Sequence, residues 1–448
     1  MAAENLTLDL ARVASQIKLA DLPPDIRTLV KQCVLDFLGV TIAGADTDLV
    51  RILREELATQ GGNAEATIIG SVHRVSTHSA ALVNGTASHA LDYDDVNYAL
   101  MGHPTVPVLP ALLALAEQGS YSGAEVMVAF VAGYEFECRV GLAVAPGHYA
   151  RGFHATATLG ALGAAAACAR LLGLDAATTA HAVGIAATQA AGLKSMFGTD
   201  CKPLHAGHAA RNGLLAAGLA ARGFGSRLDS LECAQGFIAT HSPDSHSDAA
   251  RATPRGGFHL HTNLFKYHAS CYETHAAIEC ARALRAAVDI EHVREVVVTV
   301  NPYCDKICNI AAPTTGLEAK FSLRQTVAFA LAGRDTADPY LFVDANVRDP
   351  SIQSLRDKVR IELSDRVAAS QAQMQVTSTR GGAWRHQHDA SIPATDLAAQ
   401  EIRLRDKFRR LVMPLCGETA VARMIQLCER LEEQTTLNDL LSATRIAG

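Results

Sequence analysis

The stretch ATATLGALGAAAACARLLGL, residues 155–174, consists mainly of alanine, glycine and leucine and carries a single charge, Arg170. Alanine is the strongest helix former, and small side chains allow helix axes to approach closely. We therefore predict a buried core helix here. Residues 176–193 and 206–222 have a similar composition. Together the three segments predict a group of closely packed central helices.

The composition of the whole chain agrees with a large helical protein. The 448 residues are 49% hydrophobic and only 5% aromatic. Strands favour aromatic and β-branched residues, so this balance favours helices over a β-sandwich. The length suggests two or three domains. A formal net charge of −6 argues against a nucleic-acid partner.

Helical signals run through the first 240 residues. DIRTLVKQCVLDFLGVTIAGA, residues 25–45, repeats apolar side chains at the i, i+3, i+4 spacing of one buried stripe. Ser122 followed by Glu125 matches a capping box and predicts a helix start. Asp175 precedes another helical segment in the same way. The polar stretch 241–257 is predicted to be a linker or exposed loop.

Strand signals appear only in the second half of the chain. VREVVVTVN, residues 293–301, is the clearest strand, and 358–363 and 372–382 are further candidates, with a helix predicted at 320–333. Helical patterns return after residue 392. We therefore predict a mostly α protein in which a smaller α+β domain, residues 255–392, is inserted into a larger all-helical domain formed by residues 1–254 and 393–448.

The cysteines and the apolar runs bear on the compartment. Eleven cysteines are scattered along the chain, and no secretory pattern is found at its start. A reducing cytoplasm fits these features best. Every run of about 18 apolar residues contains a charge, so we expect no membrane partner.

Four clusters combine groups that titrate or bind anions. HALDYDDVNYALMGHPT, residues 89–105, holds three carboxylates within four residues, and so it requires a cationic partner, a metal or solvent. A solvated loop is the alternative for this cluster, and a capping or packing role is the alternative for His154. The clusters contribute His89, Asp92, Asp94, Asp95 and His103; His154; Lys202, His205 and His208 ahead of a Gly/Ala helix; and Lys266, His268 and His275.

Lysine usage draws attention to two of these segments. The chain has only nine lysines among its 40 basic residues. Where arginine supplies most surface charge, a lysine beside proline, glycine and histidine is a candidate for a specific role, and its compact charge suits a carboxylate. Lys202 and Lys266 meet this description.

Metal binding is a further alternative. The pairs His205/His208, His259/His261 and His386/His388 could each supply two ligands, yet none forms a known ligand string. Walker, dinucleotide-binding and nucleophile-elbow motifs are missing from the sequence. Nucleotide-driven and serine-hydrolase chemistry are therefore not expected.

At these clusters the sequence resembles the MmgE/PrpD family. The resemblance runs over nearly the whole chain, and HALDYDD with GHP about ten residues later is its most specific part. It implies a helical domain with an α+β lid domain, a homodimer, and chemistry without a cofactor or metal. The implied catalytic residues are Asp92, His103, His154, Lys202 and Lys266, and the implied substrate-binding residues are Lys202, Lys266, His268 and Tyr303.

The resemblance also implies the class of reaction. Family members act on small di- or tricarboxylates by moving a proton next to a carboxylate, which two lysines and two histidines can support. The region around Lys202 is more like decarboxylases of cis-aconitate and epimerases of iminodisuccinate than dehydratases of 2-methylcitrate. Val96-Asn97 stands where the decarboxylases have threonine. We therefore predict a lyase or isomerase, with a dehydratase and a non-catalytic metabolite-binding protein as alternatives.

Overall fold

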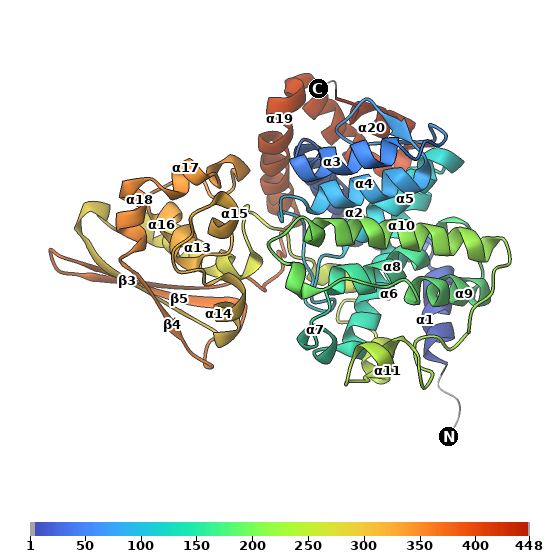
Figure 1. Cartoon of the computed structure of the whole chain (residues 1–448), viewed down its shortest axis with the longest axis horizontal. Helices are drawn as coiled ribbons and strands as arrows, with labels where there is room; N and C mark the ends of the chain where they lie inside the picture. Colours follow the sequence, from blue (N-terminus) through green and yellow to red (C-terminus); the bar gives the residue numbers. More distant parts are fainter. Residues whose placement is uncertain (1–4, 447–448) are drawn as a thin grey trace. The chain divides into compact units, whose positions relative to one another are not determined.

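The chain folds into two compact units. The computed structural model describes residues 5–446. One unit, here called the helical unit, comprises the chain up to Phe265 and again from Ala394, and the other, the sheet unit, is Lys266–Pro393 (Figure 1). The smaller unit is thus inserted in the sequence of the larger one, and most of the described residues are helical.

Residues 255–265 belong to the helical unit, so the division falls later than the predicted position at residue 255. The Leu260 N–H donates to Glu135 over 3.1 Å. Leu264 forms a backbone bridge with Val96. The stretch 241–257, predicted to be a linker or exposed loop, does not connect the two units: it contains a short helix, and the His246 N–H donates to the Ala143 carbonyl at 2.8 Å.

The helical unit is built almost entirely of helices, with one two-strand ladder. Its elements are α1 (Leu6–Gln16), α2 (Pro24–Gly44), α3 (Asp48–Ala58), β1 (Ala66–Thr67), β2 (Arg74–Val75), α4 (Thr77–His89), α5 (Thr105–Gly119), α6 (Gly123–Val144), α7 (Gly147–Ala150), α8 (Ala155–Leu171), α9 (Ala176–Ala187), α10 (Cys201–Ala221), α11 (Phe237–His241), α12 (Ser247–Arg251), α19 (Leu397–Glu429) and α20 (Asn438–Ala443).

The predicted central helix is α8, and it is buried along nearly its whole length. It packs against α5, α6, α9 and α10. Small residues make these contacts possible: a Cβ on Gly160 would lie 2.5 Å from Pro107, and one on Gly163 would lie 2.8 Å from a Glu137 oxygen. The prediction of closely packed Ala/Gly helices is confirmed, except that α9 ends at Ala187, before the predicted end at residue 193.

Helices α4 and α10 cross at two glycines. A Cβ added to Gly85 would lie 2.7 Å from the Cα of Gly207. A Cβ on Gly207 would overlap the carbonyl oxygen of Leu82. The backbones of α4 and α10 are therefore in direct contact at this crossing. It places the end of α4, at His89, beside the first turn of α10, which contains Lys202.

Two predicted helix starts are confirmed, and one is wrong. Ser122 and Glu125 form the reciprocal capping box of α6, and the Asp175 side chain accepts the Thr178 N–H at the start of α9. Helix α10 begins at Cys201, earlier than predicted. Pro203 lies in its first turn, where a missing N–H removes no intrahelical hydrogen bond.

The longest helix, α19, packs against α2 and α20. Its backbone bends at Gly417, which has φ of +77°. Among residues 5–446 it is the one helix whose length and composition would suit a membrane span. Core helices of globular proteins have the same length and composition.

The sheet unit contains a four-stranded sheet in the order β4-β3-β5-β6. The strands are β3 (Val293–Val300), β4 (Val359–Leu363), β5 (Gln371–Ser378) and β6 (Ala383–Asp389), and the helices are α13 (His275–Arg285), α14 (Pro302–Cys308), α15 (Gly316–Ala319), α16 (Leu323–Leu331), α17 (Asp344–Val347) and α18 (Pro350–Arg356). β3 pairs with β4 in parallel and with β5 antiparallel. Helices α13 and α16 contact the strands.

The three predicted strands are confirmed, but β6 was missed. Its sequence, AWRHQHD, is largely polar and half exposed. It pairs antiparallel with β5, with Trp384 opposite Val376. Gly381 and Gly382 both have positive φ and turn the chain back along β5. A polar edge strand of this kind has no apolar alternation to reveal it.

The helix crossing can be tested by adding one methyl group. Gly207→Ala should lower the free energy of unfolding by about 1–3 kcal/mol, because the backbones of α4 and α10 must separate. Gly218→Ala on the same helix is the matched control. Its added Cβ would meet only an Arg222 nitrogen at 3.4 Å.

Urea unfolding of both variants provides the measurement. The control should be neutral or more stable by up to about 1 kcal/mol, since alanine is the better helix former. Equal stabilities for the two variants would contradict the close crossing.

Candidate active site

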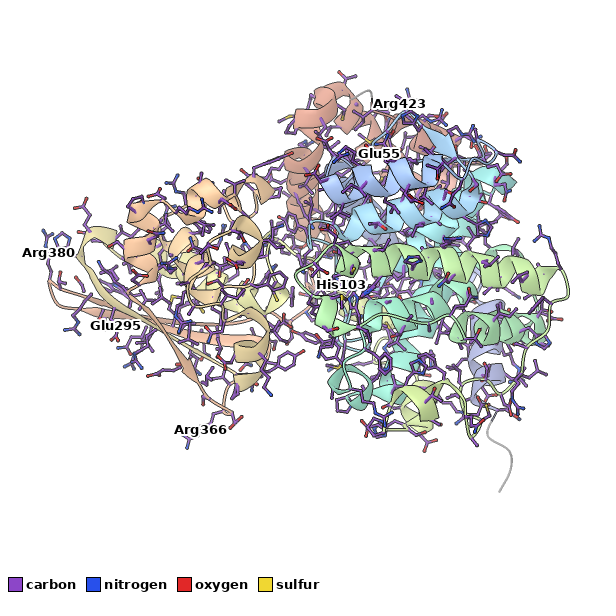
Figure 2. The ribbon with its side chains drawn as sticks, in the orientation of Figure 1. Glu55, His103, Glu295, Arg366, Arg380 and Arg423 are labelled. Atoms are coloured by element: carbon purple, nitrogen blue, oxygen red, sulfur yellow. The ribbon has the colours of Figure 1, made fainter. Side chains whose placement is uncertain are left out.

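The acidic cluster lies in the loop between α4 and α5, inside the helical unit. Figure 2 labels His103 beside helices of the helical unit, whereas Glu55 and Arg423 lie at its surface. Asp92 has φ of +51°, which is uncommon for a residue other than glycine. The end of the loop is held by the His103 N–H, which donates to the Thr156 hydroxyl of α8 at 3.0 Å. The cluster is therefore not a solvated loop.

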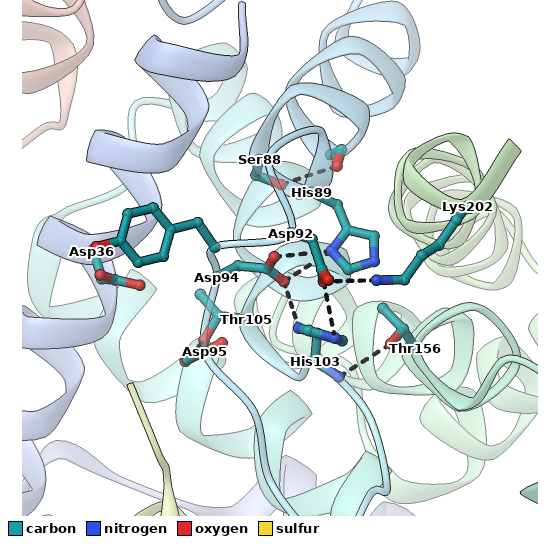
Figure 3. Close-up of polar contacts among 12 residues, drawn as sticks. Asp36, Ser88, His89, Asp92, Asp94, Asp95, His103, Thr105, Thr156 and Lys202 are labelled. Carbon is teal, nitrogen blue, oxygen red and sulfur yellow. Dashed lines mark hydrogen bonds and ion pairs between the residues drawn. The ribbon is translucent and has the colours of Figure 1, made fainter. Parts of the chain in front are cut away.

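Two carboxylates flank the His103 ring (Figure 3). Its Nδ1 lies 2.9 Å from Asp94 Oδ2, and its Nε2 lies 3.8 Å from Asp92 Oδ1. The same Asp92 oxygen accepts a hydrogen bond from Lys202 Nζ at 2.6 Å. This Lys202 ammonium, only 7% exposed, is the cationic partner that the carboxylate cluster requires.

Further imidazoles surround this pair. His89, the last residue of α4, has its Nδ1 at 2.9 and 3.0 Å from the two Asp94 oxygens. Its ring stands edge-on to that of His103, with the ring centroids 4.6 Å apart. It stacks on the ring of His154, with the centroids 5.7 Å apart. The Nδ1 atoms of His154 and His205 are 3.1 Å apart. The site thus holds four histidines in continuous contact.

Burial and neighbouring charges separate the protonation states of these groups. Burial alone would raise the pKa of Asp94, but the two imidazoles in contact with it hold that pKa well below the usual range. Burial lowers the pKa of His89 to about 4. Burial, together with nearby His89 and Lys202, also holds the pKa of His154 well below its ordinary value. Asp94 is therefore ionised, and His89 and His154 are neutral, at physiological pH.

A second buried ion pair supports the loop from behind. Lys407 of α19 is fully buried and lies 2.6 Å from Asp36 Oδ1 of α2. The Lys407 ammonium also donates to the Tyr93 carbonyl at 2.7 Å and sits over the Tyr93 ring. Burial raises the pKa of Asp36 to about 6, against the effect of Lys407. The C-terminal segment thus fixes the backbone between Asp92 and Asp94.

The structure brings four of the predicted site residues together: Asp92, His103, His154 and Lys202. Lys266, His268 and Tyr303 lie in the sheet unit. There both His268 nitrogens have partners: Nδ1 contacts the Thr336 hydroxyl at 2.8 Å, and Nε2 contacts Glu279 at 3.1 Å. Lys266 is buried and Tyr303 half-buried. Substrate roles for these three residues stay predictions.

The site also includes four residues to which the sequence analysis assigned no specific role, namely His89, Asp94, His205 and Lys407. Three of them stand within the clusters already noted, but spacing alone does not show which neighbours turn inward. The signal for Lys407 was the scarcity of lysine. Its surroundings, RLRDKFRR, resemble an exposed helix face.

The structure also bears on metal binding. Ligand atoms of His89, Asp92, Asp94 and His103 lie within 4.8 Å of one another, so this group could hold a cation. The three histidine pairs noted in the sequence do not converge in this way within residues 5–446. Lys202 already places a positive charge on Asp92. The arrangement therefore combines a buried ammonium, two carboxylates and several imidazoles, which are groups that proton transfer uses.

Comparison with known proteins decides the family. Residues 8–249 match the MmgE/PrpD N-terminal domain, and residues 268–433 match the MmgE/PrpD C-terminal domain. The chain belongs to the MmgE/PrpD family. The two matched regions cover most of this MmgE/PrpD protein, and they leave the stretch around Lys266 between them.

Similar proteins extend over almost the whole chain. A cis-aconitate decarboxylase of Homo sapiens is 26% identical over 97% of this chain and 93% of its own length. A cis-aconitate decarboxylase of Aspergillus terreus is 25% identical over 98% and 96%. A cis-aconitate decarboxylase-like protein of Aspergillus oryzae is 30% identical over 66% of each chain. This MmgE/PrpD protein is therefore an enzyme.

The buried support of the loop can be tested by a double-mutant cycle. Lys407→Met should lower the free energy of unfolding by about 3–5 kcal/mol, because it leaves the Asp36 carboxylate buried and unpaired. Adding Asp36→Asn should restore much of that loss, since the uncompensated charge is then removed. Urea unfolding at pH 7.5 measures both. A double variant as unstable as Lys407→Met would contradict the ion pair.

Proposed function

We propose that this protein is a decarboxylase of a small unsaturated tricarboxylate and that cis-aconitate is its substrate. The observation that carries the proposal is the His103 imidazole, held between Asp92 and Asp94 with the Lys202 ammonium on Asp92. This places a proton-transferring group beside a buried cation. The names of the full-length relatives support the choice of substrate.

The chemistry of cis-aconitate explains why these groups suffice. One of its carboxylates is attached to a CH2 group next to the C=C bond. When the bond to that carboxylate breaks, carbon dioxide leaves and its electron pair forms a new C=C bond with the central carbon. The former C=C pair takes up a proton at the carbon next to the other terminal carboxylate. The products are itaconate and carbon dioxide, and one proton is consumed.

The residues of the helical unit fit this reaction. Charge accumulates on the substrate as carbon dioxide leaves, and a nearby cation stabilises it. In this proposal Lys202 binds a substrate carboxylate, and its hydrogen bond to Asp92 supports that role by holding the ammonium in position. His103 supplies the proton, since imidazole exchanges protons near neutral pH. Burial keeps the nearby His154 in its neutral form.

A panel of substrates tests the proposal. Purified protein is incubated separately with cis-aconitate, 2-methylcitrate and iminodisuccinate and followed by proton NMR. We expect itaconate to form from cis-aconitate alone. Turnover of 2-methylcitrate would indicate a dehydratase, and inversion of iminodisuccinate an epimerase. Tight binding without any turnover would indicate a metabolite-binding protein.

The same assay includes protein dialysed against a strong chelator. We expect unchanged activity, because Lys202 and the histidines supply the charges that the reaction needs. Activity that is lost and then restored by zinc or iron would assign a metal to His89, Asp92, Asp94 and His103.

The role of His103 has a specific kinetic expectation. His103→Ala should lower kcat by about 10²–10⁴, the usual effect of removing a general acid or base. His386→Ala is the control, because His386 is exposed on β6 of the sheet unit and should tolerate the change. Steady-state kinetics with cis-aconitate measures both. Full activity of His103→Ala would show that another residue moves the proton.

A further inference from the structure

Asp94 contacts two imidazoles at once. Its Oδ2 lies 2.9 Å from Nδ1 of His103, and both of its oxygens lie within 3.0 Å of Nδ1 of His89. The carboxylate is 1% exposed, so water does not compete for it. Figure 3 shows the carboxylate pointing between the two rings. Both contacts are made by the same type of ring nitrogen.

The chemistry of a carboxylate restricts what these nitrogens can be. An ionised carboxylate only accepts hydrogen bonds, so the His89 Nδ1 that is hydrogen-bonded to it carries the hydrogen. The 2.9 Å separation requires the same of the His103 Nδ1, because an unprotonated nitrogen and a carboxylate oxygen repel each other at that distance. In a neutral imidazole the other nitrogen, Nε2, is then unprotonated. For His103 this leaves Nε2 as the atom that gains and loses the proton. That atom faces Asp92, 3.8 Å away, and Lys202 lies on the far side of the same Asp92 oxygen.

We propose that Asp94 is a positioning residue, which holds His103 with its hydrogen on Nδ1 and its Nε2 directed toward the substrate. Its second contact, with His89, prevents the carboxylate from turning away. Asp94 thus acts on the reaction through His103 and does not itself touch the substrate. The kinetic part of this inference rests on the proposed decarboxylation, whereas the position of the hydrogen does not.

Titratable and charged groups from several elements surround His103. Asp92 and Asp94 of its own loop and His89 of α4 contact the ring. His154 at the start of α8 stacks on His89, and Lys202 of α10 pairs with Asp92. Burial holds the pKa values of His89 and His154 low, so both remain neutral. A substitution at Asp94 therefore changes which nitrogen of His103 carries the hydrogen, while the charges of His89 and His154 stay the same.

Asp95 provides a matched control. It is adjacent in sequence and equally buried, and it accepts a hydrogen bond from the Thr105 hydroxyl. Burial raises the pKa of Asp95 to about 7, so at neutral pH Asp95→Asn removes less negative charge than Asp94→Asn does. Asp94→Asn has the same size and shape change but replaces an acceptor by a group that also donates. The two variants thus separate the loss of a buried carboxylate from the loss of the His103 contact.

The first experiment determines which ring nitrogen of His103 carries the hydrogen. Protein labelled with ¹⁵N-histidine is examined by NMR without substrate, and the His103 signals are identified by their loss in His103→Gln. We expect a protonated Nδ1 in the wild type and in Asp95→Asn. In Asp94→Asn we expect the hydrogen to move to Nε2, because the amide can donate to Nδ1. The same Nδ1-protonated ring in wild type and Asp94→Asn would overturn the proposal.

The second experiment measures turnover of cis-aconitate. Asp94→Asn should lower kcat by about 10²–10⁴ and change KM only a few-fold, because a misplaced hydrogen impairs proton transfer and not binding. Asp94→Glu should recover part of the rate, and Asp95→Asn should stay within a few-fold of wild type. Wild-type kcat in Asp94→Asn would overturn the proposal, and so would an equal loss in Asp95→Asn. A wild-type protein without activity would refute the proposed decarboxylation, while the NMR result would still decide the role of Asp94.

Discussion

The backbones of α4 and α10 meet at Gly85 and Gly207, and neither position has room for a Cβ. The arrangement of the site depends on this contact. α4 ends at His89 and leads into the acidic loop, while α10 begins one residue before Lys202. If the two helices stood further apart, the 2.6 Å contact between Lys202 and Asp92 could not form. The small residues of the core therefore serve the geometry of the charged groups.

Burying this many ionisable groups is costly unless their charges are compensated. The structure meets the requirement in two layers. Lys407 pairs with Asp36 behind the loop, and Lys202 pairs with Asp92 in front of it. Asp94 between them lies against two imidazoles, which hold its pKa low. Each layer holds a lysine that comes from a distant part of the chain, so the loop is stable only in the folded protein.

The same balance gives the site its chemical character. Two carboxylates and a lysine surround one imidazole, and two other imidazoles are kept neutral by burial. Environments that push similar groups toward different protonation states are typical of sites that move protons. Removing carbon dioxide, removing water and inverting a carbon centre all begin at a carbon next to a carboxylate. One constellation can therefore serve related reactions within a family.

Much of the helical unit and of the candidate site could be predicted from local sequence. The Ala/Gly composition of α8 and the cap residues of α6 and α9 depend on near neighbours in the chain, and so they determined those helices. The clusters around Asp92, His154 and Lys202 were equally visible, because unusual residue types stand close together. Tertiary structure decided the rest. Only folding shows that Asp94 turns toward His103 while Asp95 turns toward Thr105, that Lys407 is buried, and that polar β6 pairs with β5. These outcomes depend on contacts between residues far apart in the chain, and no local pattern records which side chain a distant helix will meet.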